Sequence, residues 1–300
     1  MDINGFSVDP LNMEDSNPGR VVYCPGGVGR NIAENLHRLG TDVRFIGVIG
    51  DDPGGELIRN SSVRIGLNIE HSLFIKSEGS VTSVYIALMD SNGVMKLALS
   101  DMDIMEKMTK EHLDSKAGII QESSIVVLDT NLPEHTIKYI VDKFGGKTGP
   151  SFFLDAVSAR KANRAAPSLG SFDTVKLGRS EAGVLSGSKD FTKAAQILID
   201  RGIRRVFITL GKDGVYAATA DKIFFETVNY VQPQNTSGGG DAFMAGIIYG
   251  TLQGWDEKTS VLFSMAMAGI TVQSRFAAAP EMSLELVQKT LKNRGDLNEK

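Results

Sequence analysis

Three consecutive glycines followed by an aspartate form the segment of this chain with the clearest chemical potential. Gly238, Gly239 and Gly240 precede Asp241 at a predicted helix start. Glycines let backbone N–H groups approach a ligand closely, and a helix N-terminus attracts anions. Asp241 at the same place could take a proton from an attacking hydroxyl group. An anion cradle beside a base indicates phosphoryl transfer from ATP to an alcohol, but Gly-rich turns before helices are common, so this motif alone is weak.

A second glycine-rich turn lies near the other end of the chain. Gly26 and Gly27 permit a tight backbone turn, and Asn31 lies in the first turn of the helix predicted behind them. The Asn31 amide both donates and accepts hydrogen bonds, so it could bind a sugar diol. The alternative is an ordinary helix cap with an amphipathic helix. We favour that alternative for Glu34 and Asn35, but not for Gly27 and Asn31.

The elements that position these motifs alternate along the chain. Short apolar runs typical of buried strands occupy 44–50, 124–128, 151–154, 174–176 and 206–210. Helical patterns lie between or after them, at 29–39, 133–143, 181–186, 191–201, 241–253, 257–274 and 283–292. Strands that alternate with helices predict a mostly parallel α/β sheet with helices on both faces. Ligands of such folds bind at the carboxyl ends of the strands.

Two segments, 3–24 and 72–100, break this rhythm. The first is polar with scattered prolines, and the second contains two extended runs joined by Asp90-Ser91-Asn92-Gly93. An Asn-Gly turn between extended runs is a strong hairpin signal. We therefore expect a small antiparallel β lid over the strand ends of a single domain that spans 1–300.

Composition excludes several classes of protein. With 300 residues, the chain can bury a large core, and its net charge of −4 gives no sign of a nucleic-acid or membrane partner. The single cysteine, Cys24, forms no internal disulfide and fits a cytoplasmic location. The four histidines show no metal-ligand spacing, and no apolar run reaches the ~18 residues of a membrane span. The fingerprint of a dinucleotide-binding dehydrogenase is also missing.

Taken together, the two glycine motifs resemble the signatures of the ribokinase-like carbohydrate kinases. That family combines a Gly-Gly-x-x-x-Asn helix start, an Ile-Gly-x-x-Gly-x-Asp segment and a Gly-x-Gly-Asp phosphate loop. The corresponding segments here are 26–31, 46–52 and 238–241, in the family's order and with roughly 200 residues between the first and the last. The resemblance covers essentially the whole chain and implies an ATP- and Mg²⁺-dependent kinase with a ribokinase-like fold.

Longer matches are similar to the pseudouridine kinase branch of that family. They comprise the run 26–36, the segments 15–19, 99–104 and 155–158, and Lys161. The branch implies phosphorylation of the ribose 5′-hydroxyl of pseudouridine. Two alternatives stay open: a ribokinase- or adenosine kinase-type enzyme, and an inactive nucleoside-binding homologue.

The resemblance assigns roles to the motif residues. Asp241 matches the catalytic base, and the N–H groups of Gly238, Gly239 and Gly240 match the anion hole. Gly26, Gly27 and Asn31 would hold the ribose 2′- and 3′-hydroxyls. Asp2 lies where the family places an acidic sugar ligand, and its alternative is a disordered terminus.

Four further residues are candidates for substrate contacts. Asn131 follows a predicted strand and could instead cap the next helix. Lys176 ends another strand and could reach the substrate or a phosphate, or could simply be solvated. Asp101 and Met102 come from the lid and would contact the base of a nucleoside.

The nucleotide side is expected around Thr209, Gly211 and Gly214, which resemble the family's strand-turn-strand beside ATP, and around Thr236 with the glycine loop. Glu181 matches the acidic residue that organises Mg²⁺, although Gly178 replaces the family's asparagine. Asn235 stands where many relatives carry an aspartate that helps to bind a monovalent cation. Potassium activation is therefore doubtful, unless groups near Thr236, Val272 and Ser274 compensate.

Two expectations concern the ends of the sheet and the lid. Family members begin with a strand and a Gly-rich turn before the residue equivalent to Asp2, so we expect a misassigned start, or else a truncated product with a weakened core. Native protein with the mass of translation from Met1 would contradict the first reading. Lid strands in this family often pack on a second subunit, and exposed strand edges need cover, which predicts a homodimer.

Overall fold

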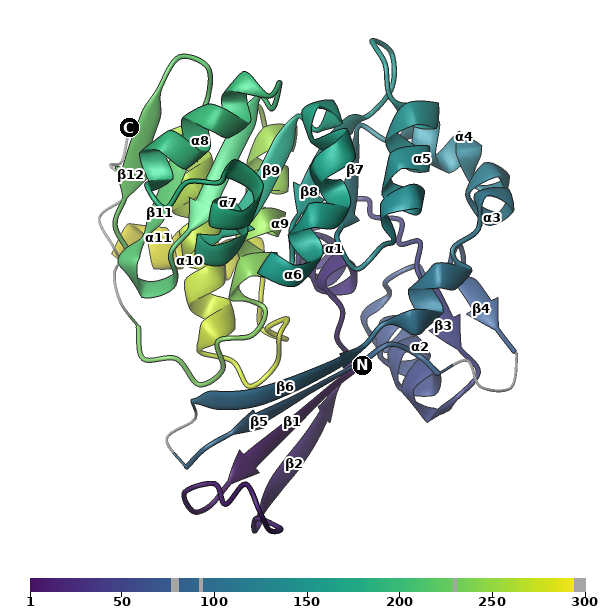
Figure 1. Cartoon of the computed structure of the whole chain (residues 1–300), viewed down its shortest axis with the longest axis vertical. Coiled ribbons are helices and arrows are strands. Elements are labelled where there is room, and N and C mark those ends of the chain that lie inside the picture. Colours follow the sequence, from purple (N-terminus) through teal and green to yellow (C-terminus); the bar gives the residue numbers. More distant parts are fainter. Residues whose placement is uncertain (77–80, 92–93, 229–230, 294–300) are drawn as a thin grey trace.

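The central sheet of the computed structural model has six strands in the order β12-β11-β10-β9-β8-β7 (Figure 1). The structure describes residues 1–300 except 77–80, 92–93, 229–230 and 294–300. Strands β7 to β10 are parallel, and β11 and β12 extend the sheet antiparallel. The strands are β7 (Ile125–Asp129), β8 (Ser151–Asp155), β9 (Thr174–Gly178), β10 (Arg205–Thr209), β11 (Val215–Ala218) and β12 (Ile223–Glu226). The predicted, mostly parallel α/β sheet is confirmed.

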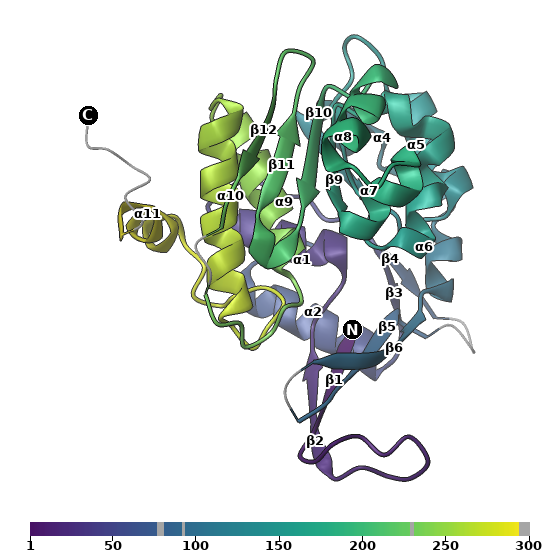
Figure 2. The ribbon, with the colours of Figure 1, turned by 60° about the vertical axis from the view of Figure 1, so that its left-hand side comes forward.

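Helices cover both faces of this sheet, because its strands are apolar on both sides. On β8, Phe152 and Leu154 join one core cluster and Phe153 joins the other. Figure 2 shows the two layers. One layer contains α5 (Glu134–Phe144), α6 (Ala159–Ala162), α7 (Arg179–Ser186) and α8 (Phe191–Asp200), and the other contains α1 (Val28–Arg38), α9 (Gly239–Leu252) and α10 (Glu257–Val272). The last described helix is α11 (Leu284–Asn293).

A separate four-stranded sheet forms the predicted lid, in the order β2-β1-β5-β6 (Figure 1). The sheet is mixed and not wholly antiparallel as predicted, because its central strands β1 and β5 run parallel. Its strands are β1 (Asp2–Ser7), β2 (Gly19–Cys24), β5 (Val84–Met89) and β6 (Met95–Asp101). Strands β5 and β6 pair antiparallel, as the hairpin pattern predicted, while Asn92 and Gly93 of the turn lie outside the described residues. Asp2 begins β1, so the alternative of a disordered terminus is wrong.

Register divides the lid into two faces. Asp2, Tyr85 and Ser100 are paired neighbours on one face, which turns toward the central sheet's cavity. Their sequence neighbours form the opposite face, because side chains alternate along a strand. That opposite face carries exposed apolar side chains, and we call it the outer lid face; it comprises Val21, Tyr23, Leu88, Leu97 and Leu99.

The strand predicted at 44–50 is shorter than expected and does not join the central sheet. Only Val48–Gly50 is extended, as β3, and it pairs with β4 (Leu73–Ile75), which also takes 73–75 out of the predicted lid segment. Within the described residues, β3 and β7 each have one paired neighbour, and both line the same cavity. The remaining helices are α2 (Pro53–Ile65), α3 (Lys110–Ser115) and α4 (Ala117–Glu122).

No helix among the described residues is long and apolar enough to cross a membrane.

Candidate active site

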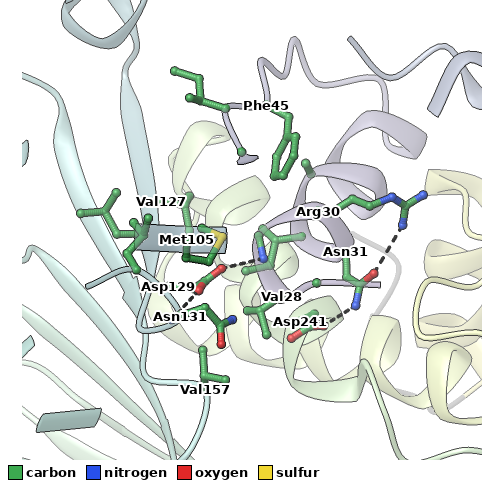
Figure 3. A pocket seen from close by; sticks show the side chains of 18 of the residues that line it. Val28, Arg30, Asn31, Phe45, Met105, Val127, Asp129, Asn131, Val157 and Asp241 are labelled. Atoms are coloured by element: carbon green, nitrogen blue, oxygen red, sulfur yellow. Dashed lines mark hydrogen bonds between the residues drawn. The ribbon is translucent and has the colours of Figure 1, made fainter. Parts of the chain in front are cut away.

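A cavity of about 1350 Å³ lies between the central sheet, the start of α1 and the lid (Figure 3). Its apolar lining comes largely from β7, β3 and the segment before β3. Eight of the candidate site residues from the sequence also line the cavity. These are Asp2, Gly26, Gly27, Asn31, Met102, Asn131, Gly238 and Asp241. The tertiary structure therefore brings together residues from both ends of the chain.

The start of α9 is uncapped and faces this cavity. Gly238 occupies the N-cap position with a φ of 81°, and no side chain accepts a hydrogen bond there. A Cβ at Gly238 would also collide with the carbonyl oxygen of Ala277. Only glycine fits this left-handed position, and the first N–H groups of the helix are left without protein acceptors. The arrangement suits an anion.

Asp241 lies in the first turn of α9 and is nearly buried, with 8 % of its surface exposed. Its Oδ2 accepts a hydrogen bond of 2.8 Å from Nδ2 of Asn31 (Figure 3). Burial, reinforced by the charge of Asp155, raises the pKa of Asp241 to about 7, against the opposing effects of Lys176 and Asn31. A carboxyl group with this pKa can accept a proton near neutral pH.

Lys176 is held beside the glycine loop by a buried ion pair. Its Nζ lies 2.7 Å from Oδ2 of Asp155, which is fully buried, and a Cβ at Gly240 would lie 2.9 Å from the same Nζ. Burial opposes the charge of Lys176, but Asp155 and Asp241 outweigh it and raise the pKa of Lys176. The alternative of a solvated lysine is therefore wrong, and the ammonium group stays charged next to the anion cradle.

The start of α1 supplies the opposite wall. Gly27 is its N-cap residue with a φ of 101°, and this helix also lacks a side-chain cap. The carboxylate of Asp2 occupies the space that a side chain at Gly26 would need. Burial raises the pKa of Asp2, against the opposing charges of the terminal amine and Arg30. Asp2 thus reaches the cavity because position 26 has no side chain.

Asn131 does not cap α5, because that helix begins at Glu134 with Pro133 as its N-cap residue. Instead, its backbone N–H donates to Oδ1 of Asp129 at 2.8 Å, and its side-chain oxygen accepts from Lys161. The other oxygen of Asp129 accepts from the Gly29 N–H at 3.0 Å (Figure 3). Asp129 therefore ties the end of β7 to the start of α1.

The two lid candidates differ. Met102 lines the cavity, whereas Asp101 is exposed at the end of β6, outside the cavity lining, and accepts a hydrogen bond from the Asp103 N–H.

The residues expected on the nucleotide side lie at the ends of β9 and β10. The Thr209 hydroxyl donates to the Leu177 carbonyl at 3.2 Å, and Gly211 and Gly214 take positive φ angles in the turn before β11. Thr236 is exposed. The carboxylate of Glu181, in the first turn of α7, occupies the space that a side chain at position 178 would fill. A side chain at position 178 would therefore displace this carboxylate.

Groups considered for a monovalent cation are already engaged. Asn235 donates to the Arg275 carbonyl and accepts from the Ser237 N–H. The Val272 carbonyl accepts from two backbone N–H groups, and the Ser274 hydroxyl accepts from Phe276. Among the described residues, no group of three or more His, Cys, Asp or Glu side chains could hold a metal ion.

Sequence reasoning missed several polar residues of the site. Asp129 and Asp155 each end an apolar strand, so the rule that ligands bind at carboxyl ends of strands could have identified them. Arg164 and the contacts of Lys161 had no comparable signal. The backbone of Val157 was also not anticipated: its φ of 55° is the one positive value outside glycine among the described residues.

The parallel sheet, the uncapped glycine loop and the β lid together define a ribokinase-like fold. An Escherichia coli protein of the ribokinase class, solved in complex with ATP and Mg²⁺, shares it at a TM-score of 0.82, with 16 % identity and 97 % of each chain covered. A carbohydrate kinase from Agrobacterium tumefaciens has a TM-score of 0.79 and 28 % identity over 97 % of this chain and 94 % of its own.

The family model of the pfkB family carbohydrate kinases matches residues 1–283. The chain therefore belongs to the pfkB family of carbohydrate kinases. Among curated proteins, pseudouridine kinase of Escherichia coli is 31 % identical over 304 residues, which cover 99 % of this chain and 96 % of that protein.

Proposed function

We propose that this kinase transfers the γ-phosphoryl group of ATP to the ribose 5′-hydroxyl of pseudouridine, giving pseudouridine 5′-phosphate and ADP. The pseudouridine kinase relative supports the substrate, since the similarity runs through nearly the full length of both chains. The observation that carries the reaction is the buried Asp241 at the uncapped start of α9, hydrogen-bonded by Asn31 at 2.8 Å and open to the lid-side cavity.

In this reaction the acceptor's 5′-oxygen forms a bond to the γ-phosphorus, and the bond from that phosphorus to the bridging oxygen of ATP breaks. Asp241 takes the hydroxyl proton as the new bond forms, and its pKa of about 7 suits that task. The N–H groups of Gly238, Gly239 and Gly240 stabilise the charge on the transferred phosphoryl oxygens. Lys176 lies close enough to Gly240 to add a positive charge.

The nucleoside's ribose would lie between α1 and the lid. Gly27 and Asn31, with Asp2 beside Gly26, face this space and would bind the 2′- and 3′-hydroxyls. Asn131 and Met102 also line the cavity and would contact the base, and Asp101, which lies outside the cavity lining, would join them only after a change in the lid. Asn31 thus serves both the ribose and the catalytic carboxylate.

ATP would lie over the ends of β9 and β10, against Thr209, Gly211, Gly214 and the loop with Thr236. Mg²⁺, when bound, would neutralise the phosphate charge, and Glu181 is the carboxylate placed to orient it, with phosphate oxygens and water as the other ligands. We propose no monovalent cation requirement, because the polar groups of Asn235 already hydrogen-bond the Arg275 carbonyl and the Ser237 N–H.

We also propose a cytoplasmic homodimer that buries the outer lid face. Tyr23 and Leu99 are 61 % and 67 % exposed on the two edge strands of the lid sheet. Val21 and Leu97 lie two residues away on the same strands, with Leu88 between them in the register. A contiguous apolar surface of this kind marks an interaction site more often than chance exposure does.

The test is phosphate transfer from ATP to pseudouridine, uridine, adenosine and ribose, measured with the wild type, Asp241→Asn and Asp142→Asn. Asp142 is an exposed surface aspartate and serves as the matched control. Transfer to pseudouridine that Asp241→Asn abolishes and Asp142→Asn retains is the expected result. Transfer to ribose or adenosine alone would replace the substrate, and no transfer by a folded protein would favour the inactive nucleoside-binding homologue.

A further inference from the structure

Lys161 connects the lid to the central sheet inside the cavity. It lies on α6, and its Nζ donates to Oδ1 of Asn131 at 2.7 Å and to Oγ of Ser100 at 3.1 Å. Ser100 belongs to lid strand β6, while Asn131 follows the end of β7. All three residues line the cavity. One ammonium group therefore joins two walls that approach the ligand from opposite sides.

The contacts of Asn131 fix which way its amide points. An ammonium group has only donors, so the atom that it bonds must be the amide oxygen. On the other side, the amide nitrogen interacts with the carboxylate of Asp129 and opposes the rise in its pKa that burial causes. The side chain is thus held between an anion and a cation, and these two charges fix the orientation of its amide. Asn131 is also 8 % exposed, so it has little room to turn.

The donors that remain point to a class of ligand. Lys161 has three N–H groups and uses two of them, and the Asn131 amide nitrogen carries two, for which Asp129 is the neighbouring acceptor. Each residue therefore keeps at least one N–H for the cavity. A ligand group that fits these two residues is therefore an acceptor, such as a carbonyl oxygen, and an amino group would leave N–H facing N–H.

The backbone under this pair is held in place at a cost. Nη1 of Arg164 donates to the carbonyls of Asn131 at 2.9 Å and of Thr130 at 3.3 Å. On the other side, α6 follows Val157, a β-branched residue with a φ of 55°. Strained residues of this kind persist where the surrounding structure enforces them, and they cluster at functional sites. These contacts and this strained residue accordingly hold Lys161 and Asn131 in fixed positions.

We propose that Lys161, together with Asn131, is a specificity-determining residue that selects acceptors whose base carries a carbonyl oxygen in place of an amino group. This inference rests on the proposed nucleoside kinase function and deepens it. Through Ser100, the same ammonium group couples the lid's position to the base, so recognition and lid placement share one contact.

Uridine and cytidine are the matched probes, because they differ only along one edge of the base, where uridine has a carbonyl oxygen beside an N–H and cytidine has an amino group beside an unprotonated nitrogen. Their Kd values would be measured by calorimetry without ATP, and their kcat/KM values by phosphate transfer, alongside pseudouridine. For the wild type, we expect uridine to be preferred over cytidine about tenfold or more. Lys161→Met keeps the apolar stem and removes the donors, so the preference should fall toward equality. Lys107→Met, at an exposed position, is the control and should keep it.

Asn131→Asp gives an independent second variant, since it puts an acceptor where the amide nitrogen stood. It should weaken uridine binding relative to cytidine binding. If Lys161→Met melts far below the wild type, the preference of Asn131→Asp alone tests the inference. An equal preference in the wild type, or a preference that both variants retain, would overturn the inference. Absence of transfer to every acceptor would count against the proposed function alone, because the calorimetric comparison needs no phosphoryl transfer.

Discussion

The end of the central sheet and the outer lid face both depart from the usual rule that apolar side chains are buried and charged ones exposed. The sheet end buries charged groups, and the lid face exposes apolar ones. Asp155, Lys176 and Asp241 are charged or titratable groups buried at the carboxyl ends of β8 and β9 and at the start of α9. On the lid, Leu97 and Leu99 are apolar and exposed to water. Among the described elements, only the central sheet has helices on both of its faces (Figure 2).

The comparison shows that each region lowers the stability of the folded chain, and by a different physical effect. Burying a charge costs free energy unless it is paired, and Asp241 is only partly compensated by Lys176 and Asn31. Leaving leucine side chains exposed forgoes the burial that would stabilise the lid. Neither arrangement stabilises a single folded chain, and both agree with the proposed roles, which are catalysis at the sheet end and association through the lid.

The largest expected effect is on catalysis. Asp241→Asn should lower kcat by about 10²–10⁴, because the amide cannot accept the hydroxyl proton. In the wild type, kcat/KM should rise with pH through about 7, the pKa of the Asp241 carboxyl group in the folded enzyme, and then level off. A pH–rate profile that is flat between pH 5 and pH 8 for the wild type would remove Asp241 from the role of base.

A pair of leucine truncations sharpens the comparison of the two sheets. Leu177 on β9 is fully buried, so Leu177→Ala should cost about 2–5 kcal/mol of unfolding free energy through lost packing and a cavity. Leu99 on β6 is 67 % exposed, so Leu99→Ala should change the monomer's stability by only about 0.5 kcal/mol. Urea unfolding at low protein concentration measures both. Equal losses would mean that the lid face is buried in the folded chain.

The buried carboxyl group should make the active enzyme less stable than its inactive variant. The pKa of Asp241 rises from 3.8 to about 7 on folding, so its contribution to stability falls as pH increases between these two values. Asp241→Asn should therefore raise Tm by about 2–4 °C or more at pH 8, and by less at pH 5, where the native carboxyl group is already protonated. A variant less stable than the wild type at pH 8 would contradict this account of the burial cost.

The smallest expected change in the folded chain comes from the outer lid face. Leu97→Lys combined with Leu99→Lys should leave the fold of the monomer intact but convert a dimer to a monomer in light scattering after gel filtration. Lys96→Gln, on a neighbouring residue of the same strand, is the control. A wild type that is monomeric at micromolar concentration would remove the proposed interface.

Much of the architecture could be predicted from the sequence because its signals are local. The run at 151–154 became β8 (Ser151–Asp155), one residue longer than predicted, and the run at 174–176 became the first three residues of β9 (Thr174–Gly178). The 44–50 run failed, because an apolar segment does not specify its pairing partner: Val48–Gly50 pairs with β4. Residues 3–24 were predicted to belong to the lid, but no strand pattern within this polar segment located β1 (Asp2–Ser7) or β2 (Gly19–Cys24).

By itself, the sequence determined the two glycine turns and the helix starts behind them. Gly27 and Gly238 take backbone angles that other residues rarely adopt, and this requirement acts within a few residues. Only the tertiary structure decided that Asn31 hydrogen-bonds Asp241, 210 residues away, that Lys176 pairs with Asp155, and that Lys161 joins the lid to Asn131. Burial and distant charges set the pKa of Asp241, and both arise only when the chain has folded.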